Sequence, residues 1–394
     1  MRRFVLGLIL ALAVLALFAV SASAAGFVPA PGSPFSSLGQ GPISLALPDL
    51  DRDGTPDVVV SNGLPPQSFG VLLSDGGGRL APGSPVFPTL GATGELAPGD
   101  FNGDGSADVA VCGTIRVRVL LGDGAGGLRA LSYGSAELGC GSLRTGDFDR
   151  NGTLDVVVAD GTGPQLWILL NDGAGNLTPS ATSPIPAGPS GLSVGDFNAD
   201  GSLDVATNVR VFLGDGAGGL SAAPGSPLNT GDSAAPLGVD TADFNRDGRL
   251  DLAVLNNNSN LVSRYSSVAI LVGDGNGGFR LSRGSPSYST VCCAGDLAVG
   301  DFNGDGKTDV ATVGHTDLRR PTESDDAVAV WLGNDRGGLR EAPGSPYRSV
   351  GATGLAAADL NGDGKADLVT TNFYSDSVSV LLSDLKVHGR GARP

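Results

Sequence analysis

The sequence has few histidines, few basic residues and, past its first 20 residues, no long apolar run. Only 2 of its 394 residues are histidines, which leaves few ligands for a soft metal. Lysine and arginine number 25 against 41 aspartates and glutamates, and the formal net charge of −16 argues against a nucleic-acid partner. No later stretch could span a membrane. No segment beyond the N-terminus shows a helical period, so an all-β fold is predicted.

The first 24 residues have the pattern of a secretory signal peptide. Met1 is followed by two arginines, residues 4–20 are apolar, and an A-x-A site stands at residues 22–24. The mature chain is predicted to start near Ala25 and to be secreted. A retained membrane anchor is the alternative.

The sequence contains 4 cysteines, which in a secreted chain favours disulfides over a reactive thiol site. Cys112 and Cys140 lie in neighbouring repeats, at positions expected to share one face, and are predicted to pair. Cys292 and Cys293 are adjacent in sequence. They form either a vicinal bridge or two thiols.

An acidic nine-residue pattern, D-x-[DN]-x-[DN]-G-x-x-D, organises the rest of the chain. Its copies recur about every 50 residues, which is the mark of a repeat architecture. The copies, called loops 1 to 7 with positions 1 to 9, are residues 49–57, 100–108, 147–155, 196–204, 243–251, 301–309 and 359–367.

Each repeat has the signals of four β-strands, here called A to D. Short apolar or β-branched runs flank the acidic loop on both sides, as in residues 191–197 and 155–160. An apolar run with a D-G turn follows, as in "VLLGDGAGGL" at residues 119–128, and predicts a hairpin of strands C and D. The acidic loop therefore connects strands A and B.

Repeated four-stranded units predict a β-propeller, here with seven blades; a solenoid would need a shorter and more uniform repeat. A small residue precedes each loop, as expected where innermost strands converge, and a bulky residue at position 2 should pack between blades. The last repeat ends after its strand C at residues 378–385, and residues 26–35 align with the strand D segment at 338–347. The N-terminus is therefore expected to complete the last blade and close one propeller domain over residues 25–386, with a tail at 387–394.

The loops have the chemistry of a hard-cation site. Side-chain oxygens at positions 1, 3, 5 and 9 and the carbonyl at position 7 suit Ca²⁺, while glycine at position 6 permits a sharp turn. An EF-hand would need glutamate at position 12, where Val60, Val111, Val158, Thr207, Val254, Thr312 and Thr370 stand. About seven Ca²⁺ ions are expected, with loop 3 the weakest because Asn151 replaces an aspartate.

The predicted metal ligands, with position 7 contributing only its carbonyl, are Asp49, Asp51, Asp53, Thr55, Asp57, Asp100, Asn102, Asp104, Ser106, Asp108, Asp147, Asp149, Asn151, Thr153, Asp155, Asp196, Asn198, Asp200, Ser202, Asp204, Asp243, Asn245, Asp247, Arg249, Asp251, Asp301, Asn303, Asp305, Lys307, Asp309, Asp359, Asn361, Asp363, Lys365 and Asp367.

With "DFNGDGKTD" at residues 301–309 and "GDGNGGF" at 273–279, the chain resembles the FG-GAP (VCBS) repeat proteins. That group includes the integrin α-subunit propeller and many secreted bacterial proteins. The resemblance covers nearly all of residues 26–385. It implies a seven-bladed propeller with calcium in the A–B loops, and it leaves the ligand open because fold alone does not give function.

A ligand is expected on the face opposite the acidic loops, where the segments vary. The longest B–C loops are residues 255–266 and 313–327, and tyrosines lie on or near this side: Tyr133, Tyr265, Tyr288, Tyr347 and Tyr374. Aromatic, arginine and asparagine side chains suit a glycan or a protein partner, and a monomeric adhesion module is the main prediction. Solvated loops on a passive scaffold are the first alternative.

A polysaccharide-acting enzyme is the less favoured alternative. It would use His315 with Asp317, Arg319 and Arg320 in the same loop, since the other histidine, His388, lies in the terminal tail. No serine or cysteine has an evident histidine partner in the sequence, so the chain is predicted not to be an enzyme.

Overall fold

The computed structural model describes residues 26–83, 87–88, 93–113, 116–130, 138–188, 191–232, 235–258, 265–289, 291–315, 326–349 and 351–386. The predicted signal peptide and the tail at 387–394 lie outside these ranges. So do Tyr133, Asp317, Arg319, Arg320 and His388. Among the described residues, none of the helical segments has the length and apolar character needed to cross a bilayer.

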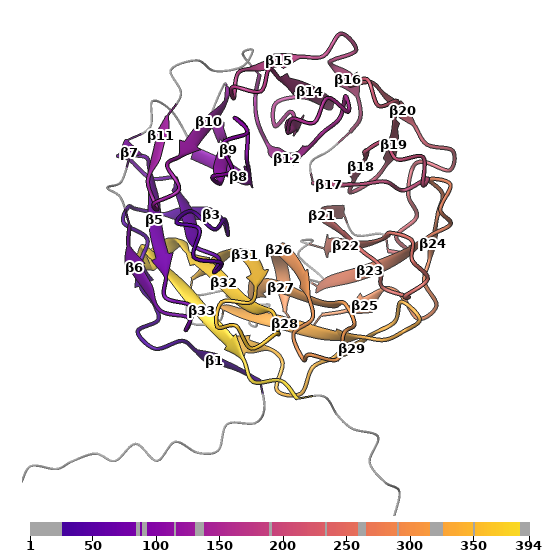
Figure 1. Cartoon of the computed structure of the whole chain (residues 1–394). Helices are drawn as coiled ribbons and strands as arrows, with labels where there is room; N and C mark the ends of the chain where they lie inside the picture. The colour runs from indigo at the N-terminus through magenta and orange to yellow at the C-terminus, as the bar shows by residue number, and fades with distance from the viewer. Residues whose placement is uncertain are drawn as a thin grey trace, which may run out of the picture.

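Seven antiparallel sheets surround a central opening, which confirms the predicted all-β, seven-bladed propeller (Figure 1). The A strands, next to the opening, are β3 (Pro42–Ala46), β8 (Thr93–Gly99), β12 (Ser142–Gly146), β17 (Leu192–Gly195), β21 (Ala235–Ala242), β26 (Cys292–Gly300) and β31 (Ala352–Ala358). The B strands are β4 (Val58–Asn62), β9 (Asp108–Gly113), β13 (Asp155–Ala159), β18 (Asp204–Thr207), β22 (Asp251–Asn258), β27 (Asp309–His315) and β32 (Asp367–Asn372).

The outer half of each blade holds strands C and D. The C strands are β5 (Ser68–Ser74), β10 (Val117–Gly122), β14 (Gln165–Asn171), β19 (Val211–Gly214), β23 (Tyr265–Gly273), β28 (Asp326–Gly333) and β33 (Ser377–Ser383). The D strands are β6 (Leu80–Pro82), β11 (Leu128–Ala130), β15 (Leu177–Pro179), β20 (Leu220–Ala222), β24 (Phe279–Leu281), β29 (Leu339–Glu341) and, for blade 7, β1 (Phe27–Pro29). One 3₁₀ turn, η2 (Phe373–Ser375), is the helical element that the description includes.

The N-terminal strand closes the ring, as the sequence predicts. Phe27 pairs with Ser383 and Pro29 with Leu381, so β1 is the outer strand of the sheet that begins with β31. The Phe27 ring packs edge-on against Phe302 at 5.8 Å between centroids. The first and last segments of the chain therefore share one blade, and that blade has no unfilled strand position.

The "GSP" segment after strand D, which is "TSP" in blade 3, has a structural role that sequence reasoning missed. Its serine Oγ accepts a hydrogen bond of 2.8–3.0 Å from an N–H of strand C, at Ser33, Ser183, Ser226, Ser285 and Ser345. A two-residue strand then pairs with strand C, namely β2 (Phe35–Ser36), β7 (Phe87–Pro88), β16 (Ile185–Pro186), β25 (Ser287–Tyr288) and β30 (Tyr347–Arg348). In blade 7 this serine is Ser33, so the N-terminus supplies the whole outer unit of that blade.

An apolar cluster fills each seam between neighbouring blades. The position 2 side chains lie in these clusters and are at most 3% exposed, as predicted: Leu50, Phe101, Phe148, Phe197, Phe244, Phe302 and Leu360. The small residue before each loop has a more specific cause than convergence on an axis. A Cβ on Gly146 would lie 2.5 Å from Leu203 of the next blade's loop, so only a small residue fits there.

Of the two cysteine pairs, one forms the disulfide that the sequence predicts and the other is present as two thiols. Cys112 and Cys140 form a disulfide across the seam of blades 2 and 3, with a Cα–Cα distance of 5.4 Å. Cys292 and Cys293 are both present as thiols, the first buried and the second half-buried. The vicinal bridge is therefore not formed in this structure.

Candidate functional site

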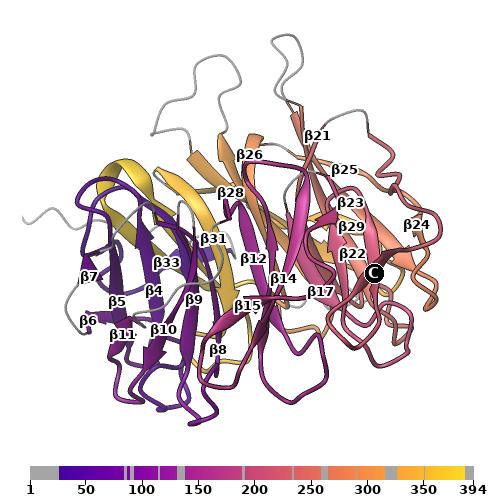
Figure 2. The same ribbon diagram turned by 90° about the horizontal axis from the view of Figure 1, so that it is seen from above.

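The acidic loops all lie on the face of the ring where the hairpin turns between strands C and D also lie. Figure 2 shows the ring edge-on. In each seam, the carbonyl of position 2 accepts a hydrogen bond from the next blade's hairpin turn or third strand, as Leu50 does from the N–H of Gly126 at 3.1 Å and Phe302 from the Ser383 hydroxyl. Every loop is thereby attached to its neighbour.

Each loop is ordered by the same hydrogen bonds from side chain to backbone. The position 1 carboxylate accepts the N–H of the position 6 glycine at 2.6–3.0 Å. Oδ1 of position 3 accepts the N–H of position 5, and Oδ1 of position 5 accepts the N–H of position 7. The position 6 glycines have φ between 75° and 88°, which a side chain would strain. The alternating Asp/Asn pattern is thus a loop-folding signal as well as a ligand set.

The position 9 carboxylate is part of the blade core. It has no exposed surface in any of the loops: Asp57, Asp108, Asp155, Asp204, Asp251, Asp309 and Asp367. One oxygen accepts the N–H of position 2 at 2.8–3.0 Å, and the other accepts an N–H at the end of strand C at 2.7–2.9 Å. This side chain therefore joins strands A and C around the end of strand B.

The two ends of the loop differ in electrostatics. Burial raises the pKa of the position 9 carboxyl, to about 6 for Asp57 and Asp155 and to about 7 for Asp309. At position 5, hydrogen bonds from the hydroxyl and N–H of Thr55 lower the pKa of the exposed Asp53. A divalent cation beside the buried carboxyl would favour its charged form.

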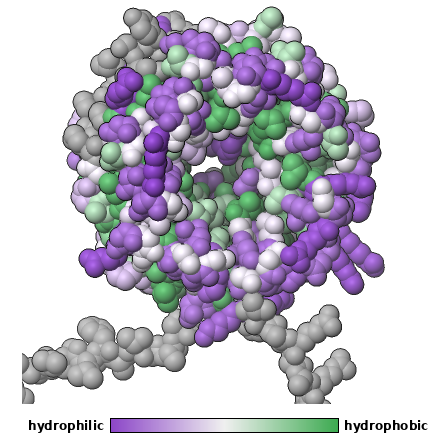
Figure 3. Space-filling model, viewed as in Figure 1, coloured by the Kyte–Doolittle hydropathy of each residue, from purple (hydrophilic) through white to green (hydrophobic). Residues whose placement is uncertain are grey.

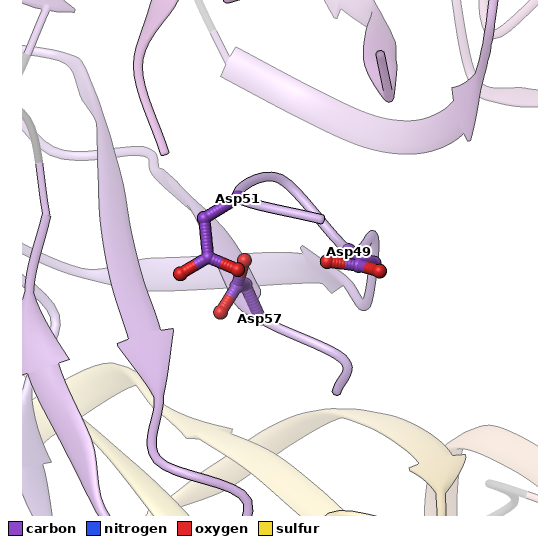
Figure 4. Close-up of side chains that lie close together, drawn as sticks. All are labelled: Asp49, Asp51 and Asp57. Atoms are coloured by element: carbon purple, nitrogen blue, oxygen red, sulfur yellow. The ribbon is translucent and has the colours of Figure 1, made fainter. Parts of the chain in front are cut away.

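In two loops the acidic oxygens converge as a metal requires. Carboxylate oxygens of Asp49, Asp51 and Asp57 lie within 4.8 Å of one another, and so do those of loop 3. Figure 4 shows the loop 1 carboxylates. Oδ1 of Asp49 is buried and accepts no hydrogen bond within the described part of the chain. A hard divalent cation would satisfy that oxygen, so the residues present fit Ca²⁺.

Loops 6 and 7 hold a competing cation of their own. Lys307 at position 7 places Nζ 2.7 Å from Asp305, and Lys365 places Nζ 3.5 Å from Asp363. Sequence reasoning counted these lysines only for their carbonyls. The ammonium groups lie beside the position 5 carboxylates, where a metal ion would displace them.

The opposite face carries exposed aromatic side chains near the ends of strands B and C. Tyr288 and Tyr374 are 60% and 64% exposed. Leu64 and Phe373 lie together over Gly41, where a Cβ would meet both, and the Phe373 ring contacts Tyr374 edge-on at 5.2 Å. Leu64, Phe373 and Tyr374 form an apolar patch at the seam of blades 7 and 1.

One prediction about this face needs correction, and others concern residues that the structure does not describe. Tyr347 is half-buried: its hydroxyl donates to the carbonyl of Pro343 at 2.6 Å and its ring packs on Phe27, so it belongs to the core of the seam. Residues 259–264 and 316–325 lie outside the described ranges, as does the side chain of Tyr265.

His315 has a carboxylate partner that the sequence did not reveal. It contacts Asp326, its cross-strand neighbour on β28, which is 3% exposed. On its other side Cys292 is the paired residue on β26 and has no exposed surface. In this structure a substrate cannot reach that sulfur.

The central opening forms a charged channel, which is open in the space-filling view (Figure 3). A cavity of about 480 Å³ is lined by Glu95, Arg144, Asp240 and Asp296 among other A-strand residues. Arg144 pairs with Glu95 at 2.6 Å. Glu95 and Asp296 also accept the N–H of the next A strand, at Leu143 and Leu355. These acids occupy the same position, five residues before their loops, and satisfy backbone groups at the inner edge of the ring.

The family of the chain follows from comparison with known sequences. The model of the FG-GAP-like repeat matches residues 49–111, 100–158, 147–207, 206–254 and 301–370, and the chain belongs to this family. None of the curated proteins compared matches the chain.

Solved structures share the fold at low sequence identity. One, described as BBS1N in complex with ARL6DN, has a TM-score of 0.59 and 13% identity, and the alignment covers 93% of this chain and 98% of that one. A lectin from Agrocybe aegerita, described as recognising non-reducing terminal N-acetylglucosamine, has a TM-score of 0.51 and 16% identity over 84% and 93% of the two chains. A Lactobacillus plantarum protein has a TM-score of 0.53 and 15% identity over 76% and 83%. At such identities the likeness concerns the fold alone.

Proposed function

We propose that this protein is a secreted, calcium-binding propeller that acts as an extracellular binding or adhesion module. The ligand, a glycan or a protein, binds the face opposite the acidic loops. The observation that carries this proposal is the difference between the two faces. One face repeats the same acidic loop, and the other presents Tyr288, Tyr374 and the patch of Leu64 and Phe373. Exposed aromatic rings suit both sugar and protein surfaces.

Secretion is supported by the N-terminal pattern and by the Cys112–Cys140 disulfide, since such bonds persist in oxidising compartments. Mass spectrometry of the exported protein should find a mature N-terminus near Ala25. Sedimentation analysis should find a monomer. Full-length protein retained in the membrane fraction would contradict secretion.

Metal binding is measured separately from ligand binding. Equilibrium dialysis should find close to seven Ca²⁺ per chain, because the acidic loop with its shared hydrogen bonds occurs that many times. Two or fewer ions per chain would contradict the metal assignment.

The ligand is sought with a glycan array and a protein pull-down in millimolar calcium. Tyr374→Ala and Tyr288→Ala should each weaken the interaction about tenfold or more if the aromatic face makes it. Arg280→Ala, an exposed residue on β24 of the same blade as Tyr288, is the matched control and should leave binding unchanged. Binding that survives the double tyrosine variant would contradict this face, and no ligand in either screen would favour a passive scaffold.

A further inference from the structure

Three of the acidic loops carry an arginine at position 4, and these side chains extend to the acidic loop of the next blade. Arg52, Arg150 and Arg246 have φ of 59–61°, in the left-handed region. The other loops have glycine or alanine there, at Gly103, Ala199, Gly304 and Gly362. The long side chain therefore occurs in loops 1, 3 and 5, and alternates with a small residue around most of the ring.

Each of these bridging arginines reaches the acidic loop of the next blade. Arg52 Nη2 donates to the carbonyl of Asp104 at 2.9 Å and to the hydroxyl of Ser106 at 2.7 Å. Arg150 Nη2 donates to the carbonyl of Asp200 at 3.0 Å. These acceptors belong to the position 5 residues of loops 2 and 4 and to the position 7 residue of loop 2, which are predicted metal ligands.

The third bridging arginine, Arg246, also contacts the acidic loop of the next blade. Arg246 Nη2 donates to the carbonyl of Gly306, at position 6 of loop 6, at 2.5 Å. Its Nη1 lies 3.6 Å from Asp335 in the hairpin turn of the same blade. In blades 2 and 4 the equivalent turn residue is a glycine, Gly124 or Gly216.

The next blade provides a fitted surface for each guanidinium. A Cβ on Gly124 would lie 3.0 Å from Nε of Arg52, and one on Gly216 would lie 3.1 Å from Nε of Arg150. Larger residues would therefore displace the arginine. Asp335 replaces this glycine in blade 6 and pairs with its arginine instead.

We propose that the bridging arginines couple the calcium loops in three pairs, loop 1 with 2, loop 3 with 4 and loop 5 with 6, and leave loop 7 uncoupled. The proposal rests on the calcium binding proposed above. An ion in loop 1 fixes Asp51 and Asp53, which flank Arg52. The arginine then holds the carbonyl of Asp104 and the hydroxyl of Ser106, so loop 2 loses less conformational freedom when it binds its own ion. The coupling is reciprocal, so an ion in loop 2 favours an ion in loop 1 equally.

Hydrogen bonds to carbonyl and hydroxyl oxygens, rather than charge pairing, carry this coupling. The arginine side chains are about half exposed, and Arg52 and Arg150 lie 3.8 Å from the nearest carboxylate oxygens of Asp104 and Asp200. Ion pairs of this kind contribute little in water. A lysine at the same position would keep the charge and lose the two-point contact.

The test compares a coupled loop with the uncoupled one in the full chain. Asp100→Asn disables loop 2, and Asp359→Asn disables loop 7. Ca²⁺ titrations by calorimetry and equilibrium dialysis should show that Asp359→Asn removes one ion and leaves the others unchanged. Asp100→Asn should remove one ion and weaken a second about fivefold or more, because loop 1 loses its partner.

Arg52 variants identify the bridge as the cause. In Arg52→Lys or Arg52→Met, adding Asp100→Asn should remove one ion with no further weakening. Melting curves in saturating calcium check that each variant is folded. If Asp100→Asn and Asp359→Asn give the same loss, or if the Arg52 variants keep the extra weakening, the coupling is wrong while calcium binding stands. If the wild-type chain binds two ions or fewer, the proposed function fails first.

Discussion

The two faces of the ring differ in how far their connections vary. On the acidic face every A–B loop spans the same nine positions and repeats the same hydrogen bonds. On the opposite face residues 208–210 connect strands B and C in blade 4, whereas in blade 6 strand B ends at His315 and strand C begins only at Asp326. The uniform face performs one local task in every blade, which is to hold strands A, B and C together through the buried position 9 carboxylate. The variable face is free to differ from blade to blade, which suits the binding role proposed for it.

Calcium removal should have the largest effect, because it acts on every loop of the uniform face at once. Extracellular modules bind Ca²⁺ with Kd of roughly 0.1–1 mM, so about 1 mM free ion stabilises each site by roughly 0.4–1.4 kcal/mol, and independent sites sum to roughly 3–10 kcal/mol. Chelation should lower the Tm by on the order of 10 °C. Calcium should restore it and magnesium should restore much less; calorimetric scans that overlay in chelator and in calcium would contradict the prediction.

Deleting residues 25–35 should have the next largest effect, because it exposes the edge of β33 without touching an acidic loop. The deletion removes the pairing of β1 and the burial of Phe27, whose side chain alone contributes about 1.5–3 kcal/mol. A lower melting temperature or aggregation is expected by calorimetry and light scattering. A peptide of residues 25–36 added in trans should reverse part of the change, and an unchanged melt would contradict closure.

Within loop 1, a substitution at position 9 should lower folding stability, and a substitution at position 5 should weaken metal binding alone. Asp57→Ala leaves the buried N–H groups of Leu50 and Ser74 without their acceptor, and should cost about 2–4 kcal/mol even in chelator. Asp53→Ala alters an exposed residue and should change little in chelator while weakening calcium binding. Urea melts with and without calcium measure both. Equal losses in chelator would show that position 9 has no special structural role.

The smallest predicted effect lies in the channel, away from both faces. Burial raises the pKa of Asp296 to about 7, and Glu95 and Arg144 act on it in opposite directions. The folded state therefore holds a proton that the unfolded state releases, so this carboxyl lowers stability as pH rises from about 4 to about 7. Asp296→Asn should gain stability relative to the wild type across that window, on the order of 1 kcal/mol because the carboxyl lines the open channel. Parallel pH profiles from urea melts would contradict this.

The parts of the structure that sequence predicted follow from the pattern of one repeat and from its comparison with the other repeats. The spacing of the acidic loop placed strands A and B, the D-G turn placed strands C and D, and the match of residues 26–35 to 338–347 gave the closure. The Cys112–Cys140 pair followed from its placement in adjacent repeats.

What sequence could not give depends on the neighbouring blade. The bridge from Arg52 to Asp104 crosses a seam, and the carboxylate of Glu95 finds the N–H of Leu143 only once two A strands lie side by side. The sequence predicts Tyr347 on or near the face opposite the acidic loops. Its partners are revealed only by the fold, because Phe27 reaches it through the closure and Pro343 through its own turn. An alignment within the repeat shows no such contact. A recurring acid five residues before the loop was the available signal for Glu95 and Asp296.

The closed blade also sets an order of events during synthesis. The hydroxyl oxygen of Ser33, which is made near the start, accepts a hydrogen bond from the N–H of Val380, 347 residues later. Until the ribosome has made β33, the first segment has no sheet to join, and the six blades before it form an open arc with two unprotected ends. A nascent or truncated chain is therefore exposed to pairing with another copy over nearly its whole period of synthesis. Completion of the last strand is the step that converts this protein from an open array into a closed one.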